Sequence, residues 1–189
     1  MSERPARSPE NYLEMAPASR SDNLLEWLFK LRDVQRQQFK NGTWLIKGKD
    51  IPWEHNRQGT MKWFMHPALT DTCIRSMLFY EQIIEPGSKS GLQLTPGGQC
   101  IFILEGRGYT LLDGQRFDWQ AEDIVQIPLR RDGVKVQHVN TDLRRRVRFV
   151  CAELNLLDTL GVDRGAALEQ IENAPEYEQD SPLPREGEG

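Results

Sequence analysis

Short stretches dominated by hydrophobic residues, separated by polar ones, recur between residues 42 and 155. They are rich in β-branched and aromatic residues and are separated by Gly, Pro, Asn and Asp, which favour turns. The stretches read TWLIKG, TMKWFMH, CIRSMLFYEQII, QCIFILEG, GYTLLDG, QRFDW, DIVQIP, VKVQHVN and VRFVCAEL. Many short strands without intervening helices predict a single antiparallel β-sandwich or barrel. Asp113-Gly114 predicts a tight hairpin within it.

A segment with the hydrophobic spacing of an α-helix precedes the predicted strands. Leucines recur at helical spacing near the start of residues 23–41, and Ser21 and Asp22 lie before them as candidate N-caps. We therefore expect one long helix, whose apolar face covers the strand domain or a partner subunit.

The two ends of the chain are expected to lie outside the strand domain. Residues 1–22 are interpreted as a flexible leader, residues 156–174 as a short helical segment and residues 175–189 as an acidic disordered tail. The acidity is local, because residues 169–189 contain seven acids and one base, a charge of −6 within a total of −4. The rest of the chain, at +2, is close to neutral.

Composition narrows the class of protein. No apolar run reaches the ~20 residues that a membrane-spanning helix needs, and the N-terminus lacks the apolar segment of a secretory signal. Three cysteines without a C-x-x-C pair fit reduced thiols, so we expect a cytoplasmic protein with no membrane partner. The LRRRVR run at 143–148 has no aromatic stacking partners, so we interpret it as a solvated strand edge and expect no nucleic-acid partner.

Two spaced motifs carry a resemblance to a known family. Gly87 and Gly106 are spaced like the ends of G-x5-H-x-H-x3,4-E-x6-G, the first motif of the cupin superfamily. Glu122 stands at the opening glycine of the second motif, G-x5-P-x-G-x2-H-x3-N, while Pro128 matches its proline and Asn140 closes it. The chain therefore resembles cupins. That resemblance implies an all-β fold, the double-stranded β-helix or jelly-roll barrel, with an N-terminal helix and short C-terminal helical turns.

The resemblance also indicates where a metal site would lie. The stretches NRQGTMKWFMHP, RSMLFYEQIIEPGSKSG and AELNLLDTLGVDRG resemble aromatic-dioxygenase-like single-domain cupins. By position, the superfamily's four metal ligands fall on Gln93, Thr95, Gln99 and Val136. Iron, manganese and zinc sites of this class need imidazole and carboxylate donors, which these side chains do not supply. We therefore expect no metal cofactor, while Fe, Mn or Zn held by His138 and displaced ligands stays an alternative.

The remaining candidate residues are polar groups expected near the barrel interior. His138 follows Val136 by two residues and shares its strand face, so it is a candidate general base, a hydrogen-bond donor or a core histidine satisfied by a backbone carbonyl. Gln93, Thr95 and Gln99 either hydrogen-bond a substrate or form a buried amide network. Arg75 is a charged residue within an otherwise apolar stretch. It either anchors a carboxylate or phenolate substrate or pairs with an acid.

Other histidines and aromatic residues are placed further from the interior. His66 is expected at a barrel rim and His55 in a turn, both facing solvent. Trp53, Trp63 and Phe64 either line a pocket entrance or pack between sheets or subunits.

Three functions are compatible with these patterns. The first is a metal-free cupin enzyme that acts on a small organic acid or aromatic compound through His138, Gln93, Gln99 and Arg75. The second is a metal-dependent dioxygenase whose ligands are displaced, with His138, a second histidine and a carboxylate such as Glu81 or Glu105. The third is a non-catalytic ligand-binding or accessory cupin. A homodimer is expected in each case, because exposed sheet edges need covering.

Overall fold

The computed structural model describes residues 18–69, 71–161, 166–178 and 183–184. Contacts divide the chain into two units, and each is described by itself. One comprises the described residues up to 45 together with 68–74; the other begins at residue 46, excludes 68–74 and contains the sheets.

The first unit contains the predicted long helix, α1 (Leu24–Asn41). Its N-cap is Asn23, whose side-chain oxygen accepts a hydrogen bond from the backbone N–H of Glu26 at 3.4 Å. The predicted cap at Ser21 or Asp22 was therefore wrong by one or two residues. Among the described residues, no helix has both the length and the apolar character that crossing a bilayer requires.

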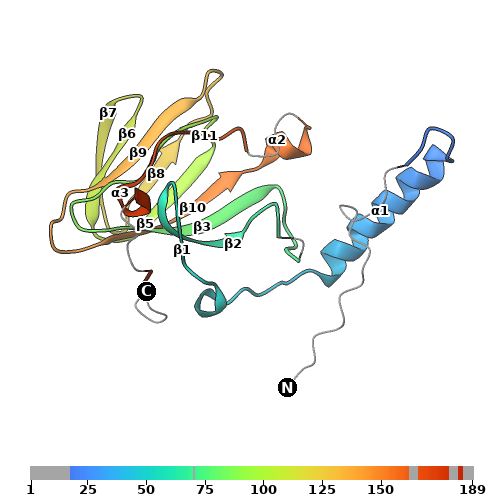
Figure 1. Cartoon of the computed structure of the whole chain (residues 1–189), viewed down its shortest axis with the longest axis horizontal. Helices are drawn as coiled ribbons and strands as arrows, with labels where there is room; N and C mark the ends of the chain where they lie inside the picture. Colours follow the sequence, from blue (N-terminus) through green and yellow to red (C-terminus); the bar gives the residue numbers. More distant parts are fainter. Residues whose placement is uncertain (1–17, 70, 162–165, 179–182, 185–189) are drawn as a thin grey trace. The chain divides into compact units, whose positions relative to one another are not determined.

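The second unit consists of two antiparallel sheets that face each other (Figure 1). The six-stranded sheet has the order β1 (Glu54–Asn56), β2 (Gly59–Met65), β3 (Met77–Ile84), β10 (Val147–Leu154), β5 (Gln99–Glu105), β8 (Ile124–Ile127). The five-stranded sheet has the order β11 (Glu169–Glu172), β4 (Leu92–Thr95), β9 (Val134–Asn140), β6 (Arg107–Leu112), β7 (Gln115–Gln120). The predicted all-β jelly-roll is confirmed, as a two-sheet sandwich that is not closed into a barrel.

The core lies between the sheets, because each strand presents alternate residues inward. In β10, Val147, Phe149 and Cys151 are fully buried, and the intervening residues are more exposed. Val134 and Val136 of β9 face them from the other sheet within the same apolar cluster. Burial of these side chains is the main force that holds the sheets together.

Several local predictions differ from the structure. TWLIKG contains no strand and leads into the 3-10 helix η1 (Gly48–Asp50). The segment 156–174 contains the helix α2 (Leu156–Thr159), but its EQIE stretch forms strand β11. The expected disordered tail begins with the short helix α3 (Pro175–Glu178), and the rest of the tail falls largely outside the described residues, as does most of the expected leader.

Three turn positions of the matched motifs have left-handed backbone conformations. Gly87 and Gly106 have φ angles of 68° and 88°. A Cβ atom at Gly106 would also lie 2.8 Å from the carbonyl oxygen of Arg146. Glu122, at the opening glycine position of the second motif, has a φ of 74°. The spacing of these positions therefore reflects the backbone geometry of the turns.

Asn140, which closes the second motif, ties one end of the sandwich together. Its side-chain NH₂ donates to the carbonyl oxygens of Ile84 at 3.1 Å, Glu85 at 3.0 Å and Arg145 at 2.8 Å. Its side-chain oxygen accepts from the backbone N–H of Asp142 at 2.9 Å. A buried amide that satisfies this many groups fixes the loop between β9 and β10 onto the core.

Glu122→Gly should stabilise the fold by about 0.5–1 kcal/mol, because glycine adopts a left-handed conformation without the Cβ penalty. The free energy of unfolding from urea titration measures this change. Gln126→Gly, at an exposed position of strand β8, is the matched control and should instead lose about 0.5–1 kcal/mol. Equal losses in both variants would contradict the strain assigned to Glu122.

Candidate functional site

The residues at the expected ligand positions do converge between the sheets. Gln93 and Thr95 project from β4, Gln99 from β5 and Val136 from β9, and all four are buried. Gln93 lies directly opposite Val136 in the β4–β9 ladder. All four side chains are therefore buried, and Gln93 and Val136 are direct neighbours there.

This set of side chains does not fit a transition-metal ion. Amides, a hydroxyl and an aliphatic side chain lack the imidazole and carboxylate donors that Fe, Mn and Zn sites use. Over the described ranges, no group of three or more His, Cys, Asp or Glu side chains is arranged to hold a metal. The carboxylates considered as displaced ligands are engaged elsewhere. Glu81 pairs with Lys62 at 3.0 Å and Arg148 at 3.5 Å, and Glu105 pairs with Arg148 at 2.9 Å.

His138 is buried in a hydrogen-bonded network rather than in open space. Its Nδ1 lies 2.8 Å from the Thr110 hydroxyl oxygen, which also accepts from Trp119 Nε1 at 2.9 Å. Its ring packs edge-on against Phe149, with centroids 5.1 Å apart. Burial lowers the pKa of His138 to about 4, so the imidazole is neutral at neutral pH. A side-chain hydroxyl, and not the expected backbone carbonyl, satisfies Nδ1.

Glu153 was missed by the sequence reasoning. It lies opposite Gln99 in the β10–β5 ladder, and the two side chains are 2% and 3% exposed. Burial raises the pKa of Glu153 to about 7, an effect that the nearby Gln99 amide and Thr95 hydroxyl partly offset. The alternation of VRFVCAEL carried the signal, since Glu153 shares the inward face of Phe149 and Cys151.

Gln99 is the least satisfied polar group in this region. Neither its amide nitrogen nor its amide oxygen has a hydrogen-bond partner within the described part of the chain. The amide lies close enough to influence the pKa of Glu153, but no well-formed hydrogen bond joins the two side chains. We refer to Thr95, Gln99 and Glu153 as the Gln99–Glu153 cluster.

Weakly acidic and aromatic side chains extend this cluster. Tyr80 lies opposite Cys151 in the β3–β10 ladder. Burial raises the pKa of Tyr80 well above its usual value, with further contributions from Cys151 and Glu153, so the phenol keeps its proton. Burial likewise raises the pKa of the Cys151 thiol, which argues against a nucleophilic role. Trp63 packs against Tyr80 with ring centroids 5.0 Å apart.

Arg75 does not lie within a strand as predicted. It lies two residues before β3, and its guanidinium donates to the carbonyl oxygen of Pro67 at 2.9 Å. His55 is in strand β1, not in a turn, and its Nδ1 lies 2.9 Å from the Thr60 hydroxyl. His66 follows β2 directly and stacks edge-on against Trp63.

Glu153→Gln should become progressively more stable than the parent protein as the pH rises from about 4.5 to about 7. The native carboxyl has the higher pKa, so it binds more protons than the unfolded chain in this window, and the parent loses stability there. Above pH 7, the gain in the free energy of unfolding of Glu153→Gln relative to the parent should approach roughly 3 kcal/mol. Urea unfolding across this range measures it, and the titration of His138 cancels between the two proteins.

Glu105→Gln is the matched control, because it removes a carboxylate from a half-exposed position. A stability difference for Glu153→Gln that stays constant from about pH 4.5 to about pH 7 would contradict a raised pKa at Glu153.

No protein-family model matches the sequence, and no curated protein matches it either. Solved structures do match. The polyketide cyclase RemF from Streptomyces resistomycificus has a TM-score of 0.52 and 16% identity, covering 72% of this chain and 93% of its own. A Streptomyces protein solved with uridine has a TM-score of 0.50 and 8% identity, covering 72% of this chain and 97% of its own. A cupin-like protein from Thermotoga maritima has a TM-score of 0.47 and 15% identity, covering 67% of this chain and 93% of its own.

At these identities the likeness concerns the fold and not the activity. Together with the order of strands in the two antiparallel sheets, these matches show that the protein has a double-stranded β-helix, or jelly-roll, fold.

Proposed function

We propose that the protein binds a small organic acid or aromatic compound at the Gln99–Glu153 cluster, without the metal that such folds commonly use. The observation that carries the proposal is the Gln99 side chain, 3% exposed and with neither amide atom hydrogen-bonded among the described residues. Buried amides nearly always have partners, so an unpartnered one needs an explanation. A bound ligand is the explanation that the surrounding groups favour.

The cluster defines the chemistry of that ligand. Leaving a buried polar group unpaired costs about 1–3 kcal/mol, which a ligand would recover by pairing with it. The Gln99 amide offers a donor and an acceptor, and Glu153 adds a carboxyl that is close to half protonated at neutral pH. A carboxylic acid, an enol or a phenol presents the complementary pair of groups. Trp63 and Tyr80 provide an aromatic wall beside it.

The same groups supply acid–base chemistry. A carboxyl with a pKa near 7 can take a proton from a substrate carbon and return it, because its two protonation states are similarly populated. The Gln99 NH₂ group would donate to the oxygen on which negative charge develops. One similar fold belongs to a polyketide cyclase, so enzymatic turnover is compatible with this architecture. Isomerisation or cyclisation by proton transfer is the reaction class that these residues support.

Gln99→Leu tests the proposal directly, because leucine fills similar space without the two unpaired atoms. The apo variant should be about 1 kcal/mol more stable than the parent. It should also lose the thermal shift that the parent shows with a panel of hydroxybenzoates, catechols and dicarboxylic acids. Gln126→Leu, at an exposed position of β8, is the matched control and should leave ligand binding unchanged.

Two results would contradict the proposal. A strongly destabilised Gln99→Leu variant would show that the amide is already satisfied within the protein. Stoichiometric Fe, Mn or Zn retained after desalting, and lost in His138→Ala, would favour the displaced-ligand dioxygenase instead.

We also propose a homodimer, with α1 as part of its interface. Leu25 and Leu28 of this helix are 58% and 63% exposed, which leaves apolar surface that a second copy could cover. Leu25→Glu/Leu28→Glu should shift the protein from dimer to monomer in sedimentation experiments. A parent protein that sediments as a monomer would contradict the dimer.

A further inference from the structure

A pocket lies at the opposite end of the sandwich from the Gln99–Glu153 cluster. It has a volume of about 1200 Å³ and is formed where β5 passes into β6, at the end of β7 and by the loop before β10. Gln99 and Glu105 mark the two ends of β5, six residue steps apart. At ~3.3 Å per residue the two sites are therefore separated by roughly 20 Å.

Positive charge predominates around this pocket. Four arginines and two acids line it, a net formal charge of +2. The lining residues with ionic side chains are Arg107, Arg144, Arg145, Arg146, Glu105 and Asp142. The ion pairs of these acids are with Arg107 and Arg148, and neither acid forms an ion pair with the three consecutive arginines.

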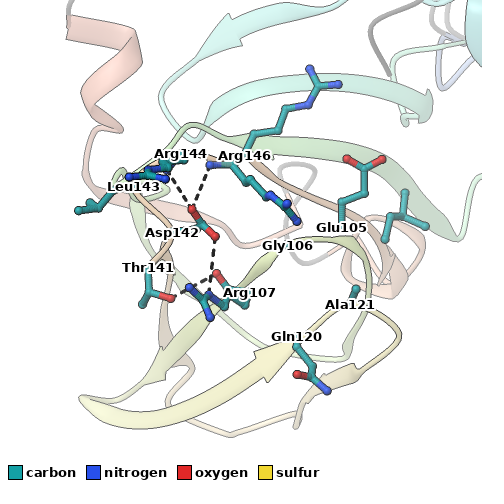
Figure 2. Close-up of a pocket in the computed structure, with 12 residues that line it drawn as sticks. Glu105, Gly106, Arg107, Gln120, Ala121, Thr141, Asp142, Leu143, Arg144 and Arg146 are labelled. Atoms are coloured by element: carbon teal, nitrogen blue, oxygen red, sulfur yellow. Dashed lines mark hydrogen bonds and ion pairs between the residues drawn. The ribbon is translucent and has the colours of Figure 1, made fainter.

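Both carboxylate oxygens of Asp142 contact neighbouring groups. One carboxylate oxygen accepts from the backbone N–H groups of Arg144 at 2.9 Å and Arg145 at 3.1 Å. The other lies 3.7 Å from the Arg107 guanidinium. These backbone hydrogen bonds hold the pKa of Asp142 below its usual value, and the charges of Arg107 and Arg145 contribute. Figure 2 shows Asp142 beside Arg107 and the following turn, with Glu105 across the pocket.

Glu105 is paired with Arg148 at 2.9 Å, on the strand that follows the loop. In the described part of the chain, Arg144, Arg145 and Arg146 form no ion pair with any carboxylate, unlike Arg107 and Arg148. Consecutive like charges repel one another, and an anion that bridged them would relieve that repulsion.

The loop that carries the arginines is fixed rather than loosely attached. The Asn140 side chain donates to the carbonyl oxygen of Arg145 at 2.8 Å and accepts from the N–H of Asp142 at 2.9 Å. The N–H of Gly87 donates to the Asp142 carbonyl oxygen at 2.8 Å. A preorganised loop loses little conformational entropy when it binds a ligand.

We propose that this pocket is a binding site for a small multivalent oxyanion, a phosphate ester or a polycarboxylate. Guanidinium groups match the geometry of both, and several acting together favour multiply charged ligands over chloride. Gln120 and Thr141 add neutral hydrogen-bonding groups to the wall. The site is separate from the Gln99–Glu153 cluster and does not depend on the function proposed for it.

Isothermal titration calorimetry with pyrophosphate and with citrate, each at low and at higher salt, tests this proposal. The parent protein should bind at least one of the two, more weakly as salt rises. Arg144→Ala/Arg145→Ala should bind at least about tenfold more weakly, since two charge-assisted contacts are lost. The preferred anion distinguishes phosphate from polycarboxylate recognition.

Arg116→Ala/Arg131→Ala removes the same charge outside the pocket and is the matched control, with affinity expected within about twofold of the parent. Arg144→Gln/Arg145→Gln replaces the alanine variant if the latter does not fold. The proposal is overturned by equal losses in pocket and control variants, or by a parent that binds neither anion at millimolar concentration. It is also overturned if single-stranded DNA binds while both small anions do not.

Discussion

The structure depends on one constraint, which is that polar groups buried between the two sheets must find partners. The His138 imidazole meets it through Thr110, whose hydroxyl is also bonded to Trp119. The Asn140 side chain satisfies the constraint by donating to three carbonyl oxygens and accepting from one N–H. These satisfied networks fix the register of β9 against both neighbouring loops and strands. Beside them the Gln99 amide stands out, because neither its nitrogen nor its oxygen has a hydrogen-bond partner among the described residues.

Sequence patterns predicted the strands well where side chains alternate strongly. Val147, Phe149 and Cys151 illustrate this, and the same period would have placed Glu153 in the interior had it been extended by one step. EQIE was misread as helical because Glu and Gln favour helices, whereas pairing with β4 decides its conformation. Arg75 was misplaced because CIRSMLFY reads as one strand, although β3 begins at Met77.

The side chains at the four expected ligand positions, Gln93, Thr95, Gln99 and Val136, are all buried, and Gln93 pairs with Val136 across β4 and β9. Their role in binding a ligand stays a prediction. Their chemistry supports the proposal of hydrogen bonding and proton transfer in place of metal coordination, with Glu153 as the titratable group. The arginine-rich pocket could not have been found from LRRRVR alone, since its cavity arises from β5, β6 and β7 together. The LRRRVR run was predicted to lie at a solvated strand edge. Its residues Val147 and Arg148 belong to β10, which lies inside its sheet.

The central claim is that the interior holds a carboxyl with a pKa near 7 beside an amide without a hydrogen-bond partner. The most direct test is a carbon-13 NMR titration of the Glu153 carboxyl. Its resonance is assigned by comparison with the spectrum of a Glu153 variant. The account predicts a midpoint near pH 7, well above the usual value of 4.5 for glutamate. A midpoint close to 4.5 would show that water or an existing hydrogen bond already solvates the charge, and would contradict the account.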